Sequence, residues 1–252
     1  SRFELELPLS EADGFSVRGL QEGDLLGESL AVGDFNADGV DDLIMSAPGS
    51  DSGAINAGAI YVVWGLRGVT RPAIDLNQLP GFTIQSTEAD QRLGQSSAIT
   101  EALSGNGQGL SLGDFNADGV NDLLIGHPSS DRNGVNSGLA YLIWGEASAQ
   151  QNDLTLSAAG LGGRGFMIQY TAAGSPFTDW YLGQGAQFIG DLNADGIDDL
   201  ALGAPGAGVG ARQSGAVFVV YGNTATGRSS TVELSTMSAA AGMRVEAAQS
   251  EG

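Results

Sequence analysis

The stretch Gly33-Asp34-Phe35-Asn36-Ala37-Asp38-Gly39-Val40-Asp41-Asp42-Leu43 decides how this chain folds, because it occurs three times. It returns at residues 113–123, and again at residues 190–200 with Leu192 and Ile197 as apolar replacements. The copies begin 80 and 77 residues apart, counted from Gly33 to Gly113 and from Gly113 to Gly190. Such a period indicates a repeat protein, in which each unit buries its apolar surface against the next.

The surroundings of the three copies repeat as well. A Gly-Phe pair precedes each copy, and an Ala-Pro or His-Pro pair follows it, before an apolar run that ends in glycine. A fourth unit begins with the same pattern at Gly242. We therefore predict one repeat region over residues 1–252. Its repeats cover about 14–80, 81–164 and 165–241, and the start of a fourth covers about 242–252.

Each unit holds about four short apolar stretches between glycine-rich turns, which predicts an all-β fold. Four short antiparallel strands are typical of a β-propeller blade, whose sheet is covered on both faces by its neighbours. We expect four-stranded antiparallel blades, three of them visible, in a larger or oligomer-completed propeller. The aromatic residues of the last apolar run in each copy are expected to pack between blades: Tyr61, Trp64, Tyr141, Trp144, Phe218 and Tyr221.

The repeated stretch also predicts a metal loop. Oxygen-bearing side chains stand at positions 1, 3, 5 and 9, a backbone carbonyl is available at position 7, and glycine at position 6 permits a sharp turn. Alternating hard oxygen donors of this kind suit Ca²⁺. The candidate ligands are Asp34, Asn36, Asp38, the Val40 carbonyl and Asp42; Asp114, Asn116, Asp118, the Val120 carbonyl and Asp122; and Asp191, Asn193, Asp195, the Ile197 carbonyl and Asp199.

Two other interpretations of the loop are weaker. An EF-hand requires a glutamate at position 12, where this chain has Met45, Ile125 and Leu202 inside apolar stretches. A plain Asp-Gly hairpin turn requires no aspartate at positions 1 and 9, yet both recur three times. We therefore predict about three Ca²⁺ ions per chain. The side chains at position 8, which are Asp41, Asn121 and Asp198, are expected to point away from the ion.

Composition excludes several classes of protein. The net charge of −20, from 30 acidic and 10 basic residues, argues against a nucleic-acid surface. No apolar stretch approaches the length of a membrane span, so no membrane insertion is expected. The chain has no cysteine, which excludes disulfides and thiolate metal sites. His127 is its only histidine, so no Ser-His or Cys-His nucleophile can be built.

The order of these motifs resembles the FG-GAP repeats of the integrin alpha-type propeller and its bacterial relatives. The "FG" motif is Leu26-Gly27, Leu93-Gly94 and Leu182-Gly183, and the "GAP" motif is Ser46-Ala47-Pro48, Gly126-His127-Pro128 and Gly203-Ala204-Pro205. The resemblance implies a seven-bladed propeller in which calcium stiffens loops on one face and the opposite face or inserted loops bind partners. The chain has no Asn-X-Ser/Thr glycosylation sequence, which favours a bacterial origin.

These observations favour a non-catalytic, calcium-dependent scaffold for cell adhesion or for binding a protein or carbohydrate ligand. Two alternatives remain: a propeller lectin, and the calcium-binding propeller part of a polysaccharide-active or phospholipase-type enzyme. A location outside the cell or at its surface is expected, because abundant external calcium fills even weak sites. Extra loop residues in the third unit form a candidate partner patch, with capping of the core of the blade as the alternative role: Phe177, Trp180 and Tyr181.

Overall fold

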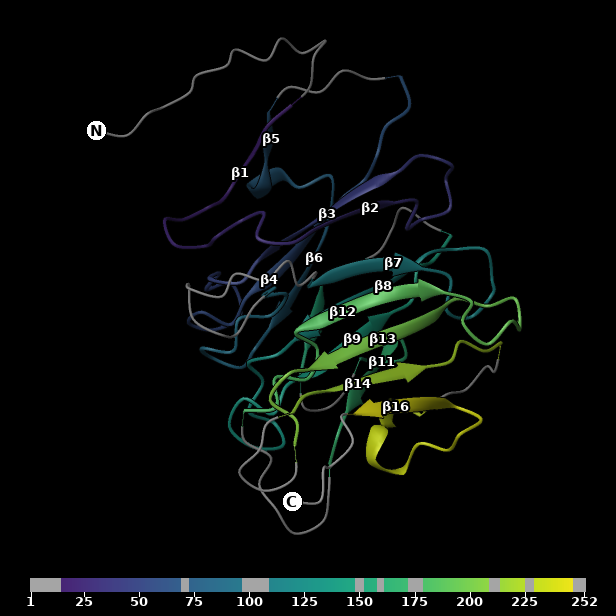
Figure 1. The fold of residues 1–252 in the computed structure, drawn as a ribbon. Coiled ribbons are helices and arrows are strands. Elements are labelled where there is room, and N and C mark those ends of the chain that lie inside the picture. The colour runs from purple at the N-terminus through teal and green to yellow at the C-terminus, as the bar shows by residue number, and fades with distance from the viewer. Residues whose placement is uncertain are drawn as a thin grey trace.

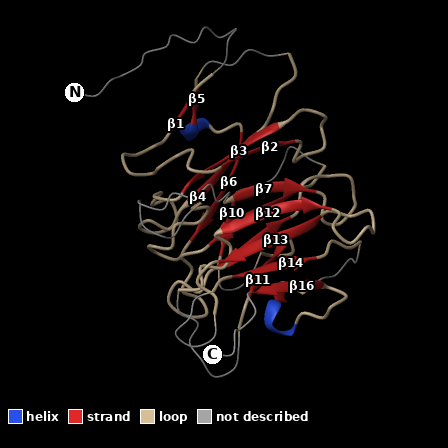
Figure 2. Ribbon diagram, in the orientation of Figure 1, coloured by secondary structure: helices blue, strands red, loops and turns tan. Residues whose placement is uncertain are grey.

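The computed structural model of the chain is an all-β fold of stacked sheets, with successive sheets following the chain from purple to yellow (Figures 1 and 2). It describes residues 15–68, 73–96, 109–147, 152–157, 161–171, 179–208, 214–224 and 229–246. No helix within these ranges is long and apolar enough to cross a membrane. The elements are β1 (Val17–Arg18), β2 (Leu30–Gly33), β3 (Asp42–Ala47), β4 (Ala59–Val63), β5 (Ile74–Asp75), η1 (Leu76–Gln78), β6 (Gly81–Ser86), β7 (Leu110–Gly113), β8 (Asp122–His127), β9 (Leu139–Ile143), β10 (Leu154–Leu156), β11 (Gly165–Gln169), β12 (Gly185–Gly190), β13 (Asp199–Ala204), β14 (Ala216–Val220), β15 (Thr231–Glu233), η3 (Leu234–Thr236) and β16 (Gly242–Glu246).

Three of the sheets share one arrangement, which confirms the predicted propeller blades. Their strand orders are β10-β6-β4-β3-β2, β15-β11-β9-β8-β7 and β12-β13-β14-β16. Four strands of each sheet pair antiparallel, and the short outer strands β10 and β15 add in parallel to β6 and β11. A two-stranded parallel pair of β1 and β5 precedes the first full sheet.

The boundaries of the sheets do not coincide with the boundaries of the sequence repeats. The sequence predicted that each repeat supplies all four strands of one blade, and the structure differs from this prediction. The first sheet takes β2, β3 and β4 from the first repeat, but its fourth strand, β6, opens the second repeat. In the same way, β11 completes the second sheet and β16 the third. Each boundary between repeats is therefore crossed by a hydrogen-bonded ladder, so a repeat cannot leave its neighbour without breaking a sheet.

The hydrophobic core lies between successive sheets. One cluster joins Ile44 and Ile60 of the first sheet to Leu123 and Ile143 of the second. A second cluster joins the second sheet to the third, and a third cluster packs the first sheet against the β1–β5 pair. The predicted packing role is confirmed for the buried aromatic residues Tyr61, Trp64, Tyr141 and Phe218, whereas Trp144 and Tyr221 are half-buried.

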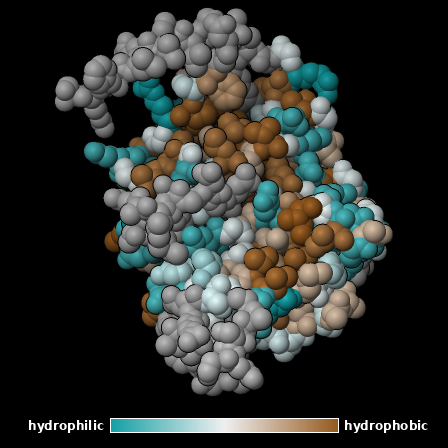
Figure 3. Space-filling view, in the orientation of Figure 1, coloured by the Kyte–Doolittle hydropathy of each residue, from teal (hydrophilic) through white to brown (hydrophobic). Residues whose placement is uncertain are grey.

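Two sheet faces remain apolar and exposed. On the third sheet Ile189, Val217, Met243 and Val245 are 39%, 42%, 40% and 54% exposed, and Figure 3 shows apolar side chains gathered on the viewer's side of these strands. On the first sheet Leu30 and Val32 of β2 are exposed. Leu110, which occupies the position of Leu30 in the next repeat, is buried against the first sheet.

Phe82 offers a test of this stacking. The side chain is buried and its ring lies 6.3 Å from the Phe35 ring and 5.7 Å from the Trp64 ring, measured between centroids. Phe82→Ala should lower the free energy of unfolding by about 3–5 kcal/mol, because it leaves a cavity between two sheets. Phe15 holds the same place in the first repeat but is 41% exposed, so Phe15→Ala should cost less than about 1 kcal/mol. Equal losses in denaturant unfolding would contradict the stacking.

Candidate metal centre

Each predicted metal loop connects the first two strands of a sheet. Residues 34–41 join β2 to β3, residues 114–121 join β7 to β8, and residues 191–198 join β12 to β13. Because the three sheets are built alike and stack on one another, the loops lie at the same edge of the stack. Position 12 falls in β3, β8 or β13, which confirms that helices do not flank these loops.

Hydrogen bonds from the backbone give the first loop its shape. Asp34 accepts the Asp38 N–H through Oδ1 (3.1 Å) and the Gly39 N–H through Oδ2 (2.8 Å). Asn36 Oδ1 also accepts the Asp38 N–H (3.0 Å), and Asp38 Oδ1 accepts the Val40 N–H (2.8 Å). The second and third loops repeat all four bonds within 0.2 Å of these lengths. The sequence therefore folds the loop the same way three times.

Two residues of the loop adopt the left-handed conformation. Gly39 has a φ of +79°, as predicted for the sharp turn at position 6. Ala37 at position 4 has a φ of +57°, which is uncommon for a residue with a Cβ atom. The equivalent alanines, Ala117 and Ala194, do the same at +58° and +62°. The side-chain oxygens at positions 1 and 3 hold this turn by accepting the backbone N–H groups that follow it.

The aspartate at position 9 is fully buried in all three loops. In the first loop Asp42 accepts the Phe35 N–H through Oδ2 (2.9 Å) and the Gly65 N–H, which follows β4, through Oδ1 (2.8 Å). Equivalent pairs of bonds hold Asp122 and Asp199. Each carboxylate thus ties the start of its loop to the end of the third strand of its sheet.

Burial raises the pKa of the position 9 carboxyl group in the first and second loops. For Asp122 the pKa reaches about 7, because burial outweighs the two backbone N–H donors and the carboxylates at positions 5 and 1 add repulsion. The pKa of Asp42 is raised for the same reasons. The ion pairs Arg132–Glu88 and Arg244–Glu246 lie elsewhere, and no loop carboxylate forms an ion pair in the described parts of the chain. A bound cation would offset the cost of these buried charges.

The donor set fits calcium in its chemistry. Oxygen is the donor atom at every candidate position, and side chains of Asp and Asn suit Ca²⁺. Across the described ranges no three His, Cys, Asp or Glu side chains converge closely enough to hold an ion by themselves. Asn36 turns its Nδ2 toward Asp38 Oδ2 (3.0 Å), as do Asn116 and Asn193 toward their partners. In each loop the asparagine at position 3 therefore donates to the carboxylate at position 5, while its oxygen accepts the position 5 backbone N–H. The Val40, Val120 and Ile197 carbonyls stay predicted ligands.

The two described residues of the predicted partner patch, Trp180 and Tyr181, are buried or half-buried. Trp180 is 7% exposed and packs against Tyr170, with ring centroids 4.7 Å apart, inside the core between the second and third sheets. This corrects its predicted role as a surface contact, because the side chain turns inward to fill the blade. Tyr181 is half-buried and its hydroxyl donates to Asp179 Oδ1 (3.2 Å). Phe177 lies outside the described residues.

Sequence reasoning missed a repeated clasp at the opposite edge of the sheets. Asp51 accepts the Asn56 N–H (2.8 Å), and Asn56 Nδ2 donates to Asp90 (2.9 Å), which follows β6. Asp131, Asn136 and Asp179 repeat this arrangement at 2.7 Å and 2.9 Å. The signal was an Asp and an Asn five residues apart after the first two Pro-containing motifs, at Asp51 and Asn56 and at Asp131 and Asn136. The clasp joins the loop between the second and third strands to the segment that leaves the fourth strand.

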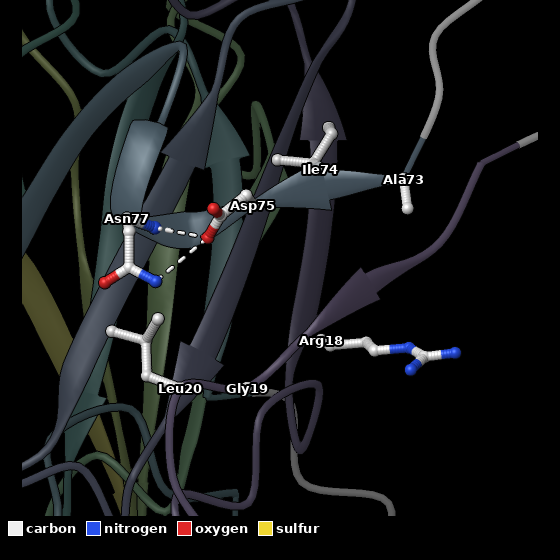
Figure 4. Close-up of a pocket in the computed structure, with 7 residues that line it drawn as sticks. All are labelled: Arg18, Gly19, Leu20, Ala73, Ile74, Asp75 and Asn77. Atoms are coloured by element: carbon white, nitrogen blue, oxygen red, sulfur yellow. Dashed lines mark hydrogen bonds between the residues drawn. The ribbon is translucent and has the colours of Figure 1, made fainter.

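A surface cavity of about 340 Å³ lies beside the β1–β5 pair. Arg18 and Asp75 are the charged residues that line it. Asp75 Oδ1 accepts both the backbone N–H and the side-chain amide of Asn77, at 2.9 Å and 3.0 Å. Figure 4 shows the Arg18 side chain extending away from Asp75. The cavity therefore does not bring an acid and a base together.

Comparison with known proteins identifies the repeat. The family model described as "FG-GAP repeat" matches residues 26–63, 106–143 and 189–220. A phosphatidylinositol-glycan-specific phospholipase D of Bos taurus is 28% identical over 78% of this chain and 20% of its own length. Integrin alpha-PS5 of Drosophila melanogaster is 28% identical over 75% of the chain and 16% of its own length. Integrin alpha-5 of Xenopus laevis is 29% identical over 78% of the chain and 15% of its own length. The chain spans about a fifth or less of these relatives.

His127 replaces the alanine of the other two GAP-like motifs and is fully buried at the end of β8. Its ring lies 6.0 Å from the Tyr141 ring, and neither ring nitrogen has a hydrogen-bond partner. Burial lowers the pKa of His127 to about 4. The imidazole is therefore neutral in the folded protein at neutral pH.

The pKa of His127 predicts a pH-dependent stability. The unfolded chain takes up the proton near pH 6.5 and the folded chain near pH 4, so stability falls as pH drops through this window. The loss reaches roughly 3 kcal/mol. His127→Ala, which restores the residue found in the other repeats, should remove this part of the pH dependence. The check is denaturant unfolding of both proteins between pH 7 and pH 4. Parallel pH curves for the two proteins would contradict the prediction.

Proposed function

Because this chain is an FG-GAP repeat protein of the integrin-like propeller family, we propose that it is a calcium-binding, non-catalytic scaffold for cell adhesion or for protein or glycan interaction. The observation that carries the proposal is the buried aspartate at position 9 of each loop. It is paired with backbone N–H groups, and two further carboxylates of the same loop stand near it in sequence. Such a concentration of negative charge in three identical loops is suited to a divalent cation.

The loop residues would supply two kinds of oxygen ligand to the ion. Asp34, Asp38 and Asp42 and their equivalents would supply charged oxygens, and Asn36 would supply a neutral one. The backbone of the loop is already held by the bonds from positions 1, 3 and 5, so little backbone ordering accompanies binding. Calcium, when bound, supplies the positive charge that the loops lack. The expected result is a more stable sheet edge, because Asp42 also holds the end of β4.

Calcium removal and return test this function. After chelation, calorimetric titration should show about three Ca²⁺ ions per chain, and the melting temperature should rise with the calcium concentration by mass action. Mg²⁺ should bind much more weakly, because it requires a small octahedral site. Asp118→Ala should leave about two ions, whereas Glu22→Ala, which removes an exposed charge outside the loops, should leave three. The absence of both heat and stabilisation would overturn the proposal.

The phospholipase relatives raise a second candidate function, the calcium-binding propeller part of a phospholipase-type enzyme. The matched segment is about a fifth of the Bos taurus protein. We propose that in such an enzyme this segment would bind calcium and would not itself cleave the phosphatidylinositol-glycan substrate. A location outside the cell or at its surface accords with the calcium sites, since calcium is abundant there.

The exposed sheet faces support a further part of the proposal, that other blades complete the propeller. Val217 occupies the position that Ile60 and Ala140 fill in the first two sheets, where both are buried against the next sheet. The exposed face of the third sheet therefore has the chemistry of an interface between blades. A second copy of this chain or the rest of a longer chain would supply the covering blade. The ligand that the complete scaffold binds is a protein or a carbohydrate.

Association of this chain tests the exposed face. The chain should self-associate reversibly in sedimentation experiments at concentrations of about 10–100 µM, since burying these side chains is favourable at roughly 25 cal/mol per Å². The double variant Val217→Glu and Val245→Glu should remain monomeric, and its melting temperature should stay close to that of the parent. Val135→Glu makes the same change at an exposed valine in the loop between β8 and β9 and serves as the control. A monomeric parent at all concentrations would contradict association between copies.

A further inference from the structure

The metal loops are connected to one another through the side chain at position 8. Asn121 of the second loop donates through Nδ2 to the backbone carbonyl of Asp34, position 1 of the first loop (3.1 Å). Asp198 of the third loop accepts through Oδ2 from the backbone N–H of Asp114, position 1 of the second loop (3.1 Å). The sequence predicts that these side chains point away from the ion, and the structure shows where they lead. Each reaches the first candidate ligand of the preceding loop.

Glycines leave room for these connections. A Cβ atom on Gly33 would lie 3.4 Å from Asn121 Nδ2 and 2.9 Å from Leu112 Cδ1. A Cβ atom on Gly145 would overlap the Asn121 carbonyl and lie 3.0 Å from the Phe35 carbonyl. The second connection has an additional backbone bond, from the Asn223 N–H to the Phe115 carbonyl (3.1 Å). Close contact between successive loops is therefore built into both junctions.

The Asn121–Asp34 contact between the second and first loops lies directly beside a predicted metal ligand. Asn121 is followed directly by Asp122, the buried position 9 aspartate, which accepts the Gly145 N–H (3.0 Å). An ion held by Asp122 would restrain this segment and hence the Asn121 side chain. Asn121 in turn restrains the peptide that carries Asp34. Order imposed on the second loop thus passes to the first through one peptide bond, between Asp122 and Asn121, and one hydrogen bond, from Asn121 to Asp34.

We propose that the position 8 residues of the second and third loops, Asn121 and Asp198, are positioning residues for the loop that precedes each of them, so that calcium in one loop strengthens calcium binding in its neighbour. The proposal rests on the calcium function proposed above. One hydrogen bond of ordinary strength corresponds to a factor of about five in affinity. By thermodynamic reciprocity the first loop strengthens the second by the same factor.

The chain contains its own control for this proposal. Asp41 stands at position 8 of the first loop, is exposed, and has no hydrogen bond in the described part of the structure. The two connected residues also differ in chemistry. Asn121 donates a hydrogen bond to the Asp34 carbonyl. An aspartate at this position would instead place an unprotonated carboxylate oxygen, which cannot donate, next to that carbonyl oxygen. Asp198 acts as an acceptor, which an asparagine Oδ1 can replace.

A calorimetric titration with Ca²⁺ in an Asp195→Ala background, where the first two loops are left to bind, tests the coupling. Two ions should bind with positive cooperativity, and Asn121→Asp should abolish it and weaken the first loop about fivefold. The expected weakening is opposite to the effect of the added negative charge, because an added carboxylate by itself would tighten calcium binding. Asn121→Ala should act like Asn121→Asp without the added charge. Asp41→Asn should leave the cooperativity intact.

The outcomes separate this inference from the function it rests on. A parent chain that binds no calcium would overturn the proposed function. A parent that binds three ions, with an Asn121→Asp variant that binds equally or more tightly, would overturn the coupling alone. Equal loss of cooperativity in Asp41→Asn would also overturn it. In the intact chain Asp198→Asn should weaken calcium binding no more than Asp41→Asn does. Both variants lose one negative charge, and the asparagine at position 198 can still accept the Asp114 N–H. Melting curves without calcium establish that each variant is folded.

Discussion

Three buried carboxylates connect the parts of this structure. Asp42, Asp122 and Asp199 each accept two backbone N–H groups, one from the loop that precedes them and one from the end of the third strand of the same sheet. A charge without exposure to water is costly unless hydrogen bonds and opposite charge compensate it. The backbone supplies the hydrogen bonds, and none of these three carboxylates forms an ion pair in the described regions. The demand for a cation therefore arises from the same residues that fix the strands.

Stacking of the sheets gives these loops their relation to one another. Apolar side chains of one sheet pack into the next, and the opening strand of each repeat pairs with the sheet before it. The loops consequently lie in a row along one edge, while the Asp-Asn-Asp clasps occupy the opposite edge. Hydrogen bonds therefore restrain the first two sheets at both edges. The contacts of Asn121 and Asp198 provide the specific route.

The two edges of the sheets also differ in electrostatic character. At the loop edge the carboxylates lie close together in sequence and burial raises the pKa of Asp42 and Asp122. At the opposite edge Asp51 and Asp90 are paired with the amide groups of Asn56. Carboxylates accept hydrogen bonds at both edges, but only the loop edge gathers three of them, Asp34, Asp38 and Asp42, within one short loop. This contrast explains why the loop edge, and not the acidic surface in general, is the candidate metal centre.

The sequence alone determined the repeat, the all-β class, the position of each loop and the packing of Tyr61, Tyr141 and Phe218, because spacing and alternation are local properties of the chain. It did not reveal that a repeat begins with a strand of the preceding blade, since strand pairing is a long-range choice. The inward turn of Trp180 and the contact from Asn121 to Asp34 were also decided by tertiary structure. Both depend on which sheet packs beside which, and residues 87 positions apart meet for that reason alone.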